Sequence, residues 1–189
     1  MVEFTDSLQP GDALLIVDVQ KDFCPGGALP VEGGDAIVPV INRWIAAAVA
    51  QDMPVYASRD WHPMGHLSFK EGGGRWPQHC IQDSDGAKFH PDLALPSSTI
   101  IVTKGVRFDQ DQNSAFDQTG LAMQFRKDGI RRLWVAGLAE DVCVLATVLD
   151  GLREGFEVAL IEKATWSITP EGGEKARQQM QAAGARIVV

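Results

Sequence analysis

Residues 131–155 read RRLWVAGLAEDVCVLATVLDGLREG and contain a strand, a turn and a helix in succession. The apolar run 132–136 is typical of a short buried strand. Apolar residues then recur on one helical face, and Gly155 is placed to end that helix: Val142, Leu145, Leu149 and Leu152. A strand followed directly by a helix is the unit from which α/β folds are built.

The same alternation extends over the rest of the chain. Five further segments have the composition of short buried strands: 13–17, 54–58, 99–102, 157–161 and 185–189. Helical patterns lie between several of them, at 121–127, at 170–183 and on the face formed by Ile37, Ile41, Trp44, Ile45 and Ala48. We therefore predict one α/β domain over residues 1–189, a Rossmann-like three-layer α/β/α arrangement around a six-stranded, mainly parallel sheet.

The composition limits the kind of protein this can be. The 189 residues include 25 Asp and Glu against 17 Lys and Arg, with 45% hydrophobic residues. These values exclude a wholly disordered chain, and the acidic balance argues against a nucleic-acid surface. No apolar run reaches the roughly 18–20 residues of a membrane span, and the N-terminal stretch MVEFTDSLQPGD lacks the pattern of an export signal. Three widely spaced cysteines argue against a disulfide framework and predict a cytoplasmic protein: Cys24, Cys80 and Cys143.

One connection is too long for an ordinary loop. Residues 60–98 contain all four histidines of the chain: His62, His66, His79 and His90. Loops of this length are usually functional or disordered. Because Trp61, Phe69 and Trp76 would be costly to leave in water, we expect a structured, functional region.

Reactive side chains follow four of the predicted strands. They are Asp18, Asp60, Lys104 and, after a short turn, Cys143. In an open parallel sheet the carboxyl ends of the strands lie at one edge, where ligands bind. The chain thus brings two carboxylates, one ammonium and one thiol to the same edge, which suggests catalysis.

Cys143 lies where a strand turns into a helix. The free N–H groups in the first turn of a helix lower the pKa of a thiol and could hold an oxyanion. The alternative is a buried structural cysteine, but Cys143 lies off the apolar stripe of the helix. Asp18 and Lys104 could be the base and cation that serve this thiol, or only a structural ion pair.

The long loop contains a pattern of metal ligands. A carboxylate and an imidazole two residues apart face one side of an extended chain, and a third group could complete an open site: Asp60, His62 and His79. Such a set suits Zn²⁺, Fe²⁺ or Mn²⁺. His66 or Glu71 could add a fourth ligand, whereas His90 is interpreted as an ordinary surface or capping residue. Phe23 and Trp61 lie close to these groups in the sequence and could flank a flat substrate.

Five segments resemble a known family, in order and at matching spacing. They are 15–23 LIVDVQKDF, 59–63 RDWHP, 76–80 WPQHC, 103–105 TKG and 137–143 GLAEDVC. Together they resemble the nicotinamidases (pyrazinamidases) of the isochorismatase-like cysteine hydrolases, from about residue 13 to the C-terminus. The D-W-H-P, H-x-S-F and W-P-x-H-C elements are similar to the metal-containing nicotinamidase branch in particular.

For catalysis, the resemblance implies a triad of Asp18, Lys104 and Cys143. It also implies a cis peptide bond between Leu138 and Ala139, and an oxyanion hole made by the backbone amides of Ala139 and Cys143. These assignments come from matching the motifs and not from spacing alone.

For substrate and metal, the resemblance implies one divalent ion on three ligands, zinc or else iron or manganese: Asp60, His62 and His79. The fourth ligand varies in this branch, so His66 and Glu71 both stay open. Phe23 and Trp61 match positions that flank the substrate ring.

The activity implied by the resemblance is hydrolysis of nicotinamide to nicotinate and ammonia through a cysteine thioester, in NAD salvage, with pyrazinamide as a further substrate. A homo-oligomer without nucleic-acid or membrane partners is also implied. The alternatives are an N-carbamoylsarcosine or ureidoacrylate amidohydrolase, or an isochorismatase that cleaves a vinyl ether. A non-catalytic scaffold or a metal storage or sensor protein would leave Asp18, Lys104 and Cys143 unexplained.

Overall fold

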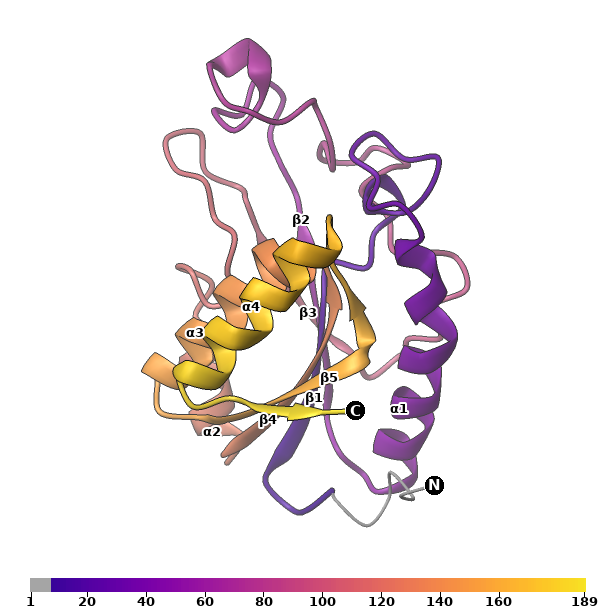
Figure 1. The fold of residues 1–189 in the computed structure, drawn as a ribbon, viewed down its shortest axis with the longest axis vertical. Helices are drawn as coiled ribbons and strands as arrows, with labels where there is room; N and C mark the ends of the chain where they lie inside the picture. The colour runs from indigo at the N-terminus through magenta and orange to yellow at the C-terminus, as the bar shows by residue number, and fades with distance from the viewer. Residues whose placement is uncertain (1–7) are drawn as a thin grey trace.

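A sheet between two layers of helices forms the centre of the molecule, as a computed structural model shows (Figure 1). The structure describes residues 8–189. The N-terminal stretch that we expect to contain no export signal therefore begins outside the described residues. All strand pairings are parallel, in the order β3-β2-β1-β4-β5-β6. The strands are β1 Asp12–Val17, β2 Val55–Asp60, β3 Ile100–Lys104, β4 Arg132–Leu138, β5 Glu157–Trp166 and β6 Arg186–Val188. The predicted α/β fold is confirmed.

The helices cover both faces of this sheet, and each face has its own apolar core. Helix α1, Val38–Ala50, lies on one face, and three helices lie on the other (Figure 1): α2 Leu121–Lys127, α3 Leu145–Arg153 and α4 Pro170–Ala182. Because successive side chains of a strand point to opposite faces, β1 contributes to both cores. Leu14 and Ile16 pack on the α1 side, and Leu15 and Val17 pack on the other.

The strand order reverses between β1 and β4, the two central strands. Ligands of open parallel sheets bind at such a reversal, beyond the carboxyl ends of the strands. The two backbones touch there because Gly137 in β4 has no side chain. A Cβ atom at Gly137 would lie 2.0 Å from the carbonyl oxygen of Val17, and its φ of +124° is unfavourable for other residues.

Helix α3 differs from its prediction in the face that it buries. Val144, Thr147, Val148 and Gly151 face the core, whereas the predicted stripe of Val142, Leu145, Leu149 and Leu152 is only half-buried. Small residues explain the difference. A Cβ atom at Gly151 would already lie 3.3 Å from the side chains of Phe116 and Val158, so this face approaches the sheet most closely.

The histidine-rich connection rises from the carboxyl edge of the sheet, at the top of Figure 1. Between β2 and β3 it contains one short 3₁₀ helix, Lys70–Gly72, and two bridges of single residue pairs. These bridges join His62 to Ile81 and Phe69 to Trp76. A third bridge joins Phe89 to Gln20, so the connection is ordered by bridges within itself and to the segment after β1, and not by membership of the sheet.

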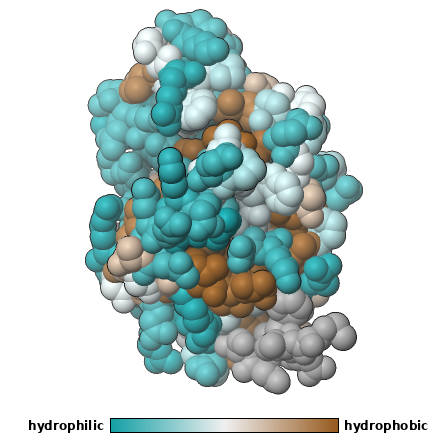
Figure 2. Space-filling model, viewed as in Figure 1, coloured by the Kyte–Doolittle hydropathy of each residue, from teal (hydrophilic) through white to brown (hydrophobic). Residues whose placement is uncertain are grey.

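Polar side chains cover most of the surface visible in Figure 2. The face in Figure 2 is mainly hydrophilic, with smaller apolar areas between the polar side chains. Within residues 8–189, no helix combines the length and the hydrophobicity that crossing a bilayer requires.

Candidate active site and metal site

Lys104 is the centre of the polar cluster at the carboxyl edge of the sheet. Its side chain is 0% exposed, and its Nζ lies 2.8 Å from Asp18 Oδ2 and 2.5 Å from Asp60 Oδ1. The same Nζ lies 3.6 Å from Cys143 Sγ. The structure therefore brings together the four groups that follow the predicted strands, with one ammonium between two carboxylates and a thiol.

The strand register places these groups. Asp60 and Lys104 end β2 and β3 and are direct partners in the ladder, which brings their side chains together. The N–H of Asp18 donates to the carbonyl oxygen of Ser58 at 3.2 Å, so β1 ends beside β2. The lysine-centred cluster is defined as Asp18, Asp60, Lys104 and Cys143. The ends of three strands fix its two carboxylates and its ammonium.

The two oxygens of the Asp18 carboxylate have different surroundings. Oδ1 accepts a hydrogen bond of 2.7 Å from the Ser58 hydroxyl. Oδ2 forms an ion pair of 2.8 Å with the Lys104 ammonium and has no second partner within the described chain. Atoms of Asp18, Asp60 and Cys143 all lie within 4.8 Å of one another. Oδ2 is therefore the atom available to take a proton from the thiol.

The surroundings move the pKa values of the two carboxyl groups in opposite directions. Burial raises the pKa of Asp18, and the charge of Asp60 adds to this effect against the opposing charge of Lys104. Burial also acts to raise the pKa of Asp60, but the charge of Lys104 outweighs it and lowers the pKa. Such a separation assigns different roles to two carboxyls. Asp18 is suited to proton transfer and Asp60 to permanent negative charge.

The pKa values of the thiol and the ammonium are both raised. Burial and the two carboxylates raise the pKa of Cys143 well above its ordinary value, against the attraction of Lys104. For Lys104, burial acts to lower the pKa, but Asp18 and Asp60 outweigh it and raise the pKa. The resting thiol thus holds its proton and needs a base, while Lys104 stays charged.

Cys143 lies in a turn that differs from the predicted first turn of an α-helix. It belongs to a π-helical segment, Glu140–Val144, which precedes α3 and follows a cis peptide bond between Leu138 and Ala139. The carbonyl oxygen of Ala139 accepts from the N–H groups of Val142 and Val144 at 3.0 and 3.1 Å. These bonds skip the N–H of Cys143, which lies between the two donors in the chain.

Three buried side chains beside this cluster form a candidate metal site. Ligand atoms of Asp60, His62 and His79 lie within 4.8 Å of one another. The Nδ1 atoms of the two imidazoles face the carbonyl oxygens of Gly105, at 2.9 Å, and Pro77, at 2.8 Å. Because a carbonyl oxygen only accepts, each Nδ1 carries the proton and each Nε2 has a free lone pair. Two such nitrogens and a carboxylate are a donor set that fits a divalent metal.

Neither candidate for a fourth ligand belongs to this group. His66 is buried, with Nδ1 2.7 Å from the Ser68 hydroxyl and Nε2 3.3 Å from the carbonyl oxygen of Gln110. Its ring lies against that of His62, with 4.3 Å between the centroids. Glu71 is exposed on the short 3₁₀ helix. His90 lies away from the site, where its Nδ1 accepts from the N–H of Asp92 at 3.3 Å.

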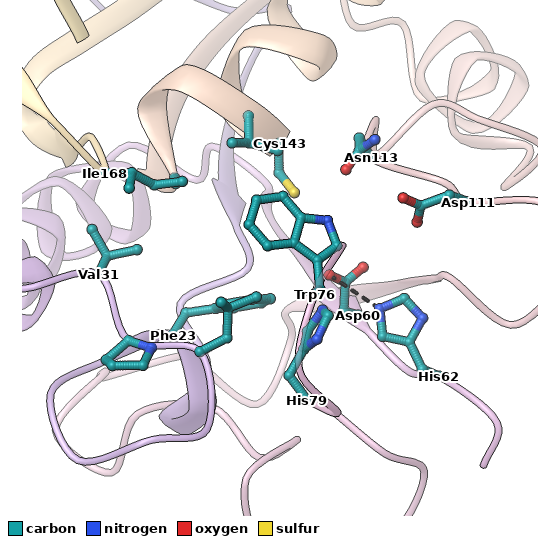
Figure 3. Close-up of a pocket in the computed structure, with 14 residues that line it drawn as sticks. Phe23, Val31, Asp60, His62, Trp76, His79, Asp111, Asn113, Cys143 and Ile168 are labelled. Atoms are coloured by element: carbon teal, nitrogen blue, oxygen red, sulfur yellow. Dashed lines mark ion pairs between the residues drawn. The ribbon is translucent and has the colours of Figure 1, made fainter. Parts of the chain in front are cut away.

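A cavity of about 100 Å³ opens between the thiol and the candidate metal ligands (Figure 3). One wall is apolar, and residues that line it include Phe23, Val31 and Ile168. The opposite wall is polar, with Asp111 and Asn113. A cavity of this size suits a small molecule and not a polymer.

The aromatic residues of the cavity differ in part from the prediction. Phe23 lines the cavity as expected, but the second aromatic side chain there is Trp76 and not Trp61. Trp61 packs against the core, with the Arg59 guanidinium 3.9 Å from its ring. Alternation explains the error, because Asp60 and His62 point into the site and the residue between them points away. Trp76 lies three residues before the candidate ligand His79 in the segment W-P-Q-H-C. This nearness in the sequence is the signal that could have predicted an aromatic side chain beside the site.

Comparisons with known proteins agree with this geometry. A sequence model described as Isochorismatase domain matches residues 12–188. The chain is 39% identical to the nicotinamidase of Escherichia coli over 94% of each chain.

Among solved structures, the pyrazinamidase of Pyrococcus horikoshii in complex with zinc matches with a TM-score of 0.92 and 44% identity, over 95% of this chain and 99% of that chain. A protein of L. infantum in complex with nicotinate matches with a TM-score of 0.86 and 38% identity, over 94% of this chain and 91% of that chain. A ureidoacrylate amidohydrolase of Pseudomonas syringae is less similar, with 28% identity over 89% of this chain and 76% of its own length.

Proposed function

The chain belongs to the isochorismatase family, and from this membership and the geometry of its site we propose that it is a nicotinamidase. It would hydrolyse nicotinamide to nicotinate and ammonia in NAD salvage, with pyrazinamide as a second substrate. The observation that carries the proposal is that the thiol cluster and the candidate metal site meet at a single cavity. The thiol cluster and the candidate metal ligands share Asp60 and line the same small cavity.

The reaction begins with activation of the thiol. Asp18 Oδ2 takes the proton of Cys143, because burial makes this carboxylate a stronger base than one in water. The thiolate then attacks the carboxamide carbon and forms a tetrahedral oxyanion. The N–H groups of Ala139 and Cys143 stabilise this oxyanion, a role supported by the position of both residues in the lining of the cavity.

The intermediate then collapses and the enzyme is regenerated. Asp18 returns the proton to the departing nitrogen, ammonia leaves, and a thioester remains on Cys143. A water molecule gives a proton to Asp18 and attacks the thioester, and the C–S bond breaks. Asp18 returns that proton to the leaving Cys143 thiolate, and the acid is released as nicotinate after losing its carboxyl proton to solvent. Lys104 holds both carboxylates in place and offsets the negative charge that develops beside it.

We propose that Asp60, His62 and His79 bind one divalent metal ion, with zinc preferred over iron or manganese. When bound, this ion supplies an electron-pair acceptor for the ring nitrogen of the substrate. Burial lowers the pKa of His79, which keeps its imidazole neutral and able to ligate. Phe23 and Trp76 would hold the ring between them, which orients the carboxamide toward Cys143.

We also propose a cytoplasmic homo-oligomer. The free state of all three cysteines supports a reducing compartment. The edge strand β3 exposes Ile100 and Ile101, which supports contact with a second copy. Light scattering of the purified protein tests the assembly, and a monomeric mass at working concentration would contradict it.

The test of the activity is ammonia release from nicotinamide, pyrazinamide and ureidoacrylate by the purified protein, with and without a chelator. We expect ammonia from nicotinamide and pyrazinamide, with activity lost on chelation and restored by zinc. Faster turnover of ureidoacrylate would favour the alternative amidohydrolase. Full activity in a protein that contains no metal would remove the ion from the proposal.

A further inference from the structure

Two polar side chains of the cavity have no role in the reaction described above. Asp111 and Asn113 form the wall opposite Phe23 and Ile168, and Figure 3 shows both near the space between Cys143 and His62. They belong to the connection between β3 and α2, in which the sequence motifs gave no assignment. A cavity that otherwise has an apolar wall uses such groups to orient its ligand.

The residue between them holds this wall in place. Gln112 is buried, and its side chain accepts from the N–H of Gly105 at 3.1 Å and donates to the carbonyl oxygen of Asp117 at 2.7 Å. Its own carbonyl oxygen lies 3.3 Å from Lys104 Nζ. Because Gln112 points into the protein, its two neighbours point into the cavity. The wall is therefore tied directly to the lysine-centred cluster.

The hydrogen-bonding capacity of this wall is largely unused. The half-buried amide of Asn113 makes no side-chain hydrogen bond within residues 8–189. Asp111 uses Oδ1 to accept from the N–H of Gln112 at 3.1 Å, which leaves Oδ2 without a partner of this kind. Both residues line the cavity, so these two acceptors are available to a ligand with N–H donors that binds there.

The chemistry of the substrate supplies such donors. In the proposed reaction the carbonyl oxygen lies against backbone amides and the ring nitrogen lies at the candidate metal ligands. The primary amide nitrogen lies near Asp18, which protonates it as it leaves, and its two N–H groups need acceptors in the substrate complex. We propose that Asn113, with Asp111 beside it, is the specificity-determining residue that accepts these N–H groups and selects primary amides over other carbonyl compounds of the same ring. This inference rests on the proposed nicotinamidase function.

The experiment compares one ligand that has the N–H groups with one that lacks them. Nicotinamide turnover is measured as kcat and KM, and nicotinaldehyde, which has the same ring and a carbonyl without N–H, is measured as a competitive inhibitor. The variants are Asn113→Leu, which keeps the shape but removes the acceptor, and Asn113→Asp, which keeps an acceptor oxygen. Circular dichroism and zinc content of each variant show whether fold and metal site are retained.

We expect Asn113→Leu to lower kcat/KM for nicotinamide about tenfold or more, while the inhibition constant of nicotinaldehyde changes less than about twofold. Asn113→Asp should lose less activity than Asn113→Leu. Equal losses for both ligands, or no loss for either, would overturn the inference and leave the proposed function intact. A wild-type protein that releases no ammonia from nicotinamide would instead overturn the proposed function, and this inference with it.

Discussion

The lysine-centred cluster and the histidine-rich connection meet at Asp60, but they hold their side chains by different means. The cluster is built on strand ends, where the ladder itself pairs Asp60 with Lys104. The imidazoles come from a segment ordered by single bridges, and backbone carbonyl oxygens orient their rings. The sheet therefore fixes Asp18, Asp60 and Lys104, whereas bridges and backbone carbonyl oxygens outside the sheet fix the two imidazoles that could hold a metal. Changes in one region should affect chemistry, and changes in the other should affect metal content and substrate binding.

The largest effect is expected from Cys143→Ala. Loss of the nucleophile should reduce ammonia release by at least about 1,000-fold, because the thioester can no longer form. Binding of nicotinate, followed by calorimetry, should stay measurable, because the candidate metal ligands and the aromatic residues are unchanged. Activity within tenfold of the wild type would contradict the assignment of the nucleophile.

His79→Ala should come next and should act through the metal. Removal of one of three ligands is expected to weaken zinc binding by about 100-fold or more, with activity falling in parallel. Mass spectrometry of the native protein measures the ion. His90→Ala is the matched control, because its contact to Asp92 lies outside the site and its zinc content and activity should match the wild type. Loss of zinc in both variants would mean that the connection as a whole, and not these ligands, holds the ion.

The two tryptophans of the connection should differ in their effect on substrate binding. Trp76→Ala is expected to raise KM about tenfold, because an aromatic contact in the cavity is lost. Trp61→Ala should leave KM within about twofold and lower the melting temperature instead, because Trp61 packs against the core. Steady-state kinetics and thermal unfolding of the two variants separate these effects. The reverse pattern would restore Trp61 as the residue beside the substrate.

Ser58→Ala should give the smallest effect, a change in pH dependence. The Ser58 hydroxyl donates to Asp18 Oδ1 and stabilises the ionised carboxylate, so its loss raises the Asp18 pKa further. Asp18 must be ionised to take the thiol proton, so the acidic limb of the kcat/KM profile should move to higher pH, by about one unit or less. An acidic limb that stays in place would assign it to another group.

The same two regions show which features a single sequence predicts. The convergence of Asp18, Asp60, Lys104 and Cys143 was predictable, because parallel strands deliver their final residues to one edge. The prediction of His62 and His79 as metal ligands depended on the resemblance of their motifs to a known family. Spacing in the sequence alone does not show how an irregular segment folds back on itself.

The errors also have physical causes. Trp61 was placed beside the substrate because it lies between two candidate ligands, although alternation turns it away from them. The buried face of α3 was predicted from its leucines, although small residues determine which face can approach the sheet. The role of Asn113 depends on where its neighbour Gln112 is anchored, which no local pattern reveals.

The glycine at the end of β4 has a consequence for how freely this sequence can change. Cys143 can be replaced at the cost of activity, but a side chain at Gly137 would meet the backbone of β1 at 2.0 Å, where no rotamer can avoid it. A library randomised at both positions and screened only for soluble, folded protein should therefore accept many residues at 143 and glycine alone at 137. A position that takes no part in the reaction thus limits mutational drift more strictly than the nucleophile does.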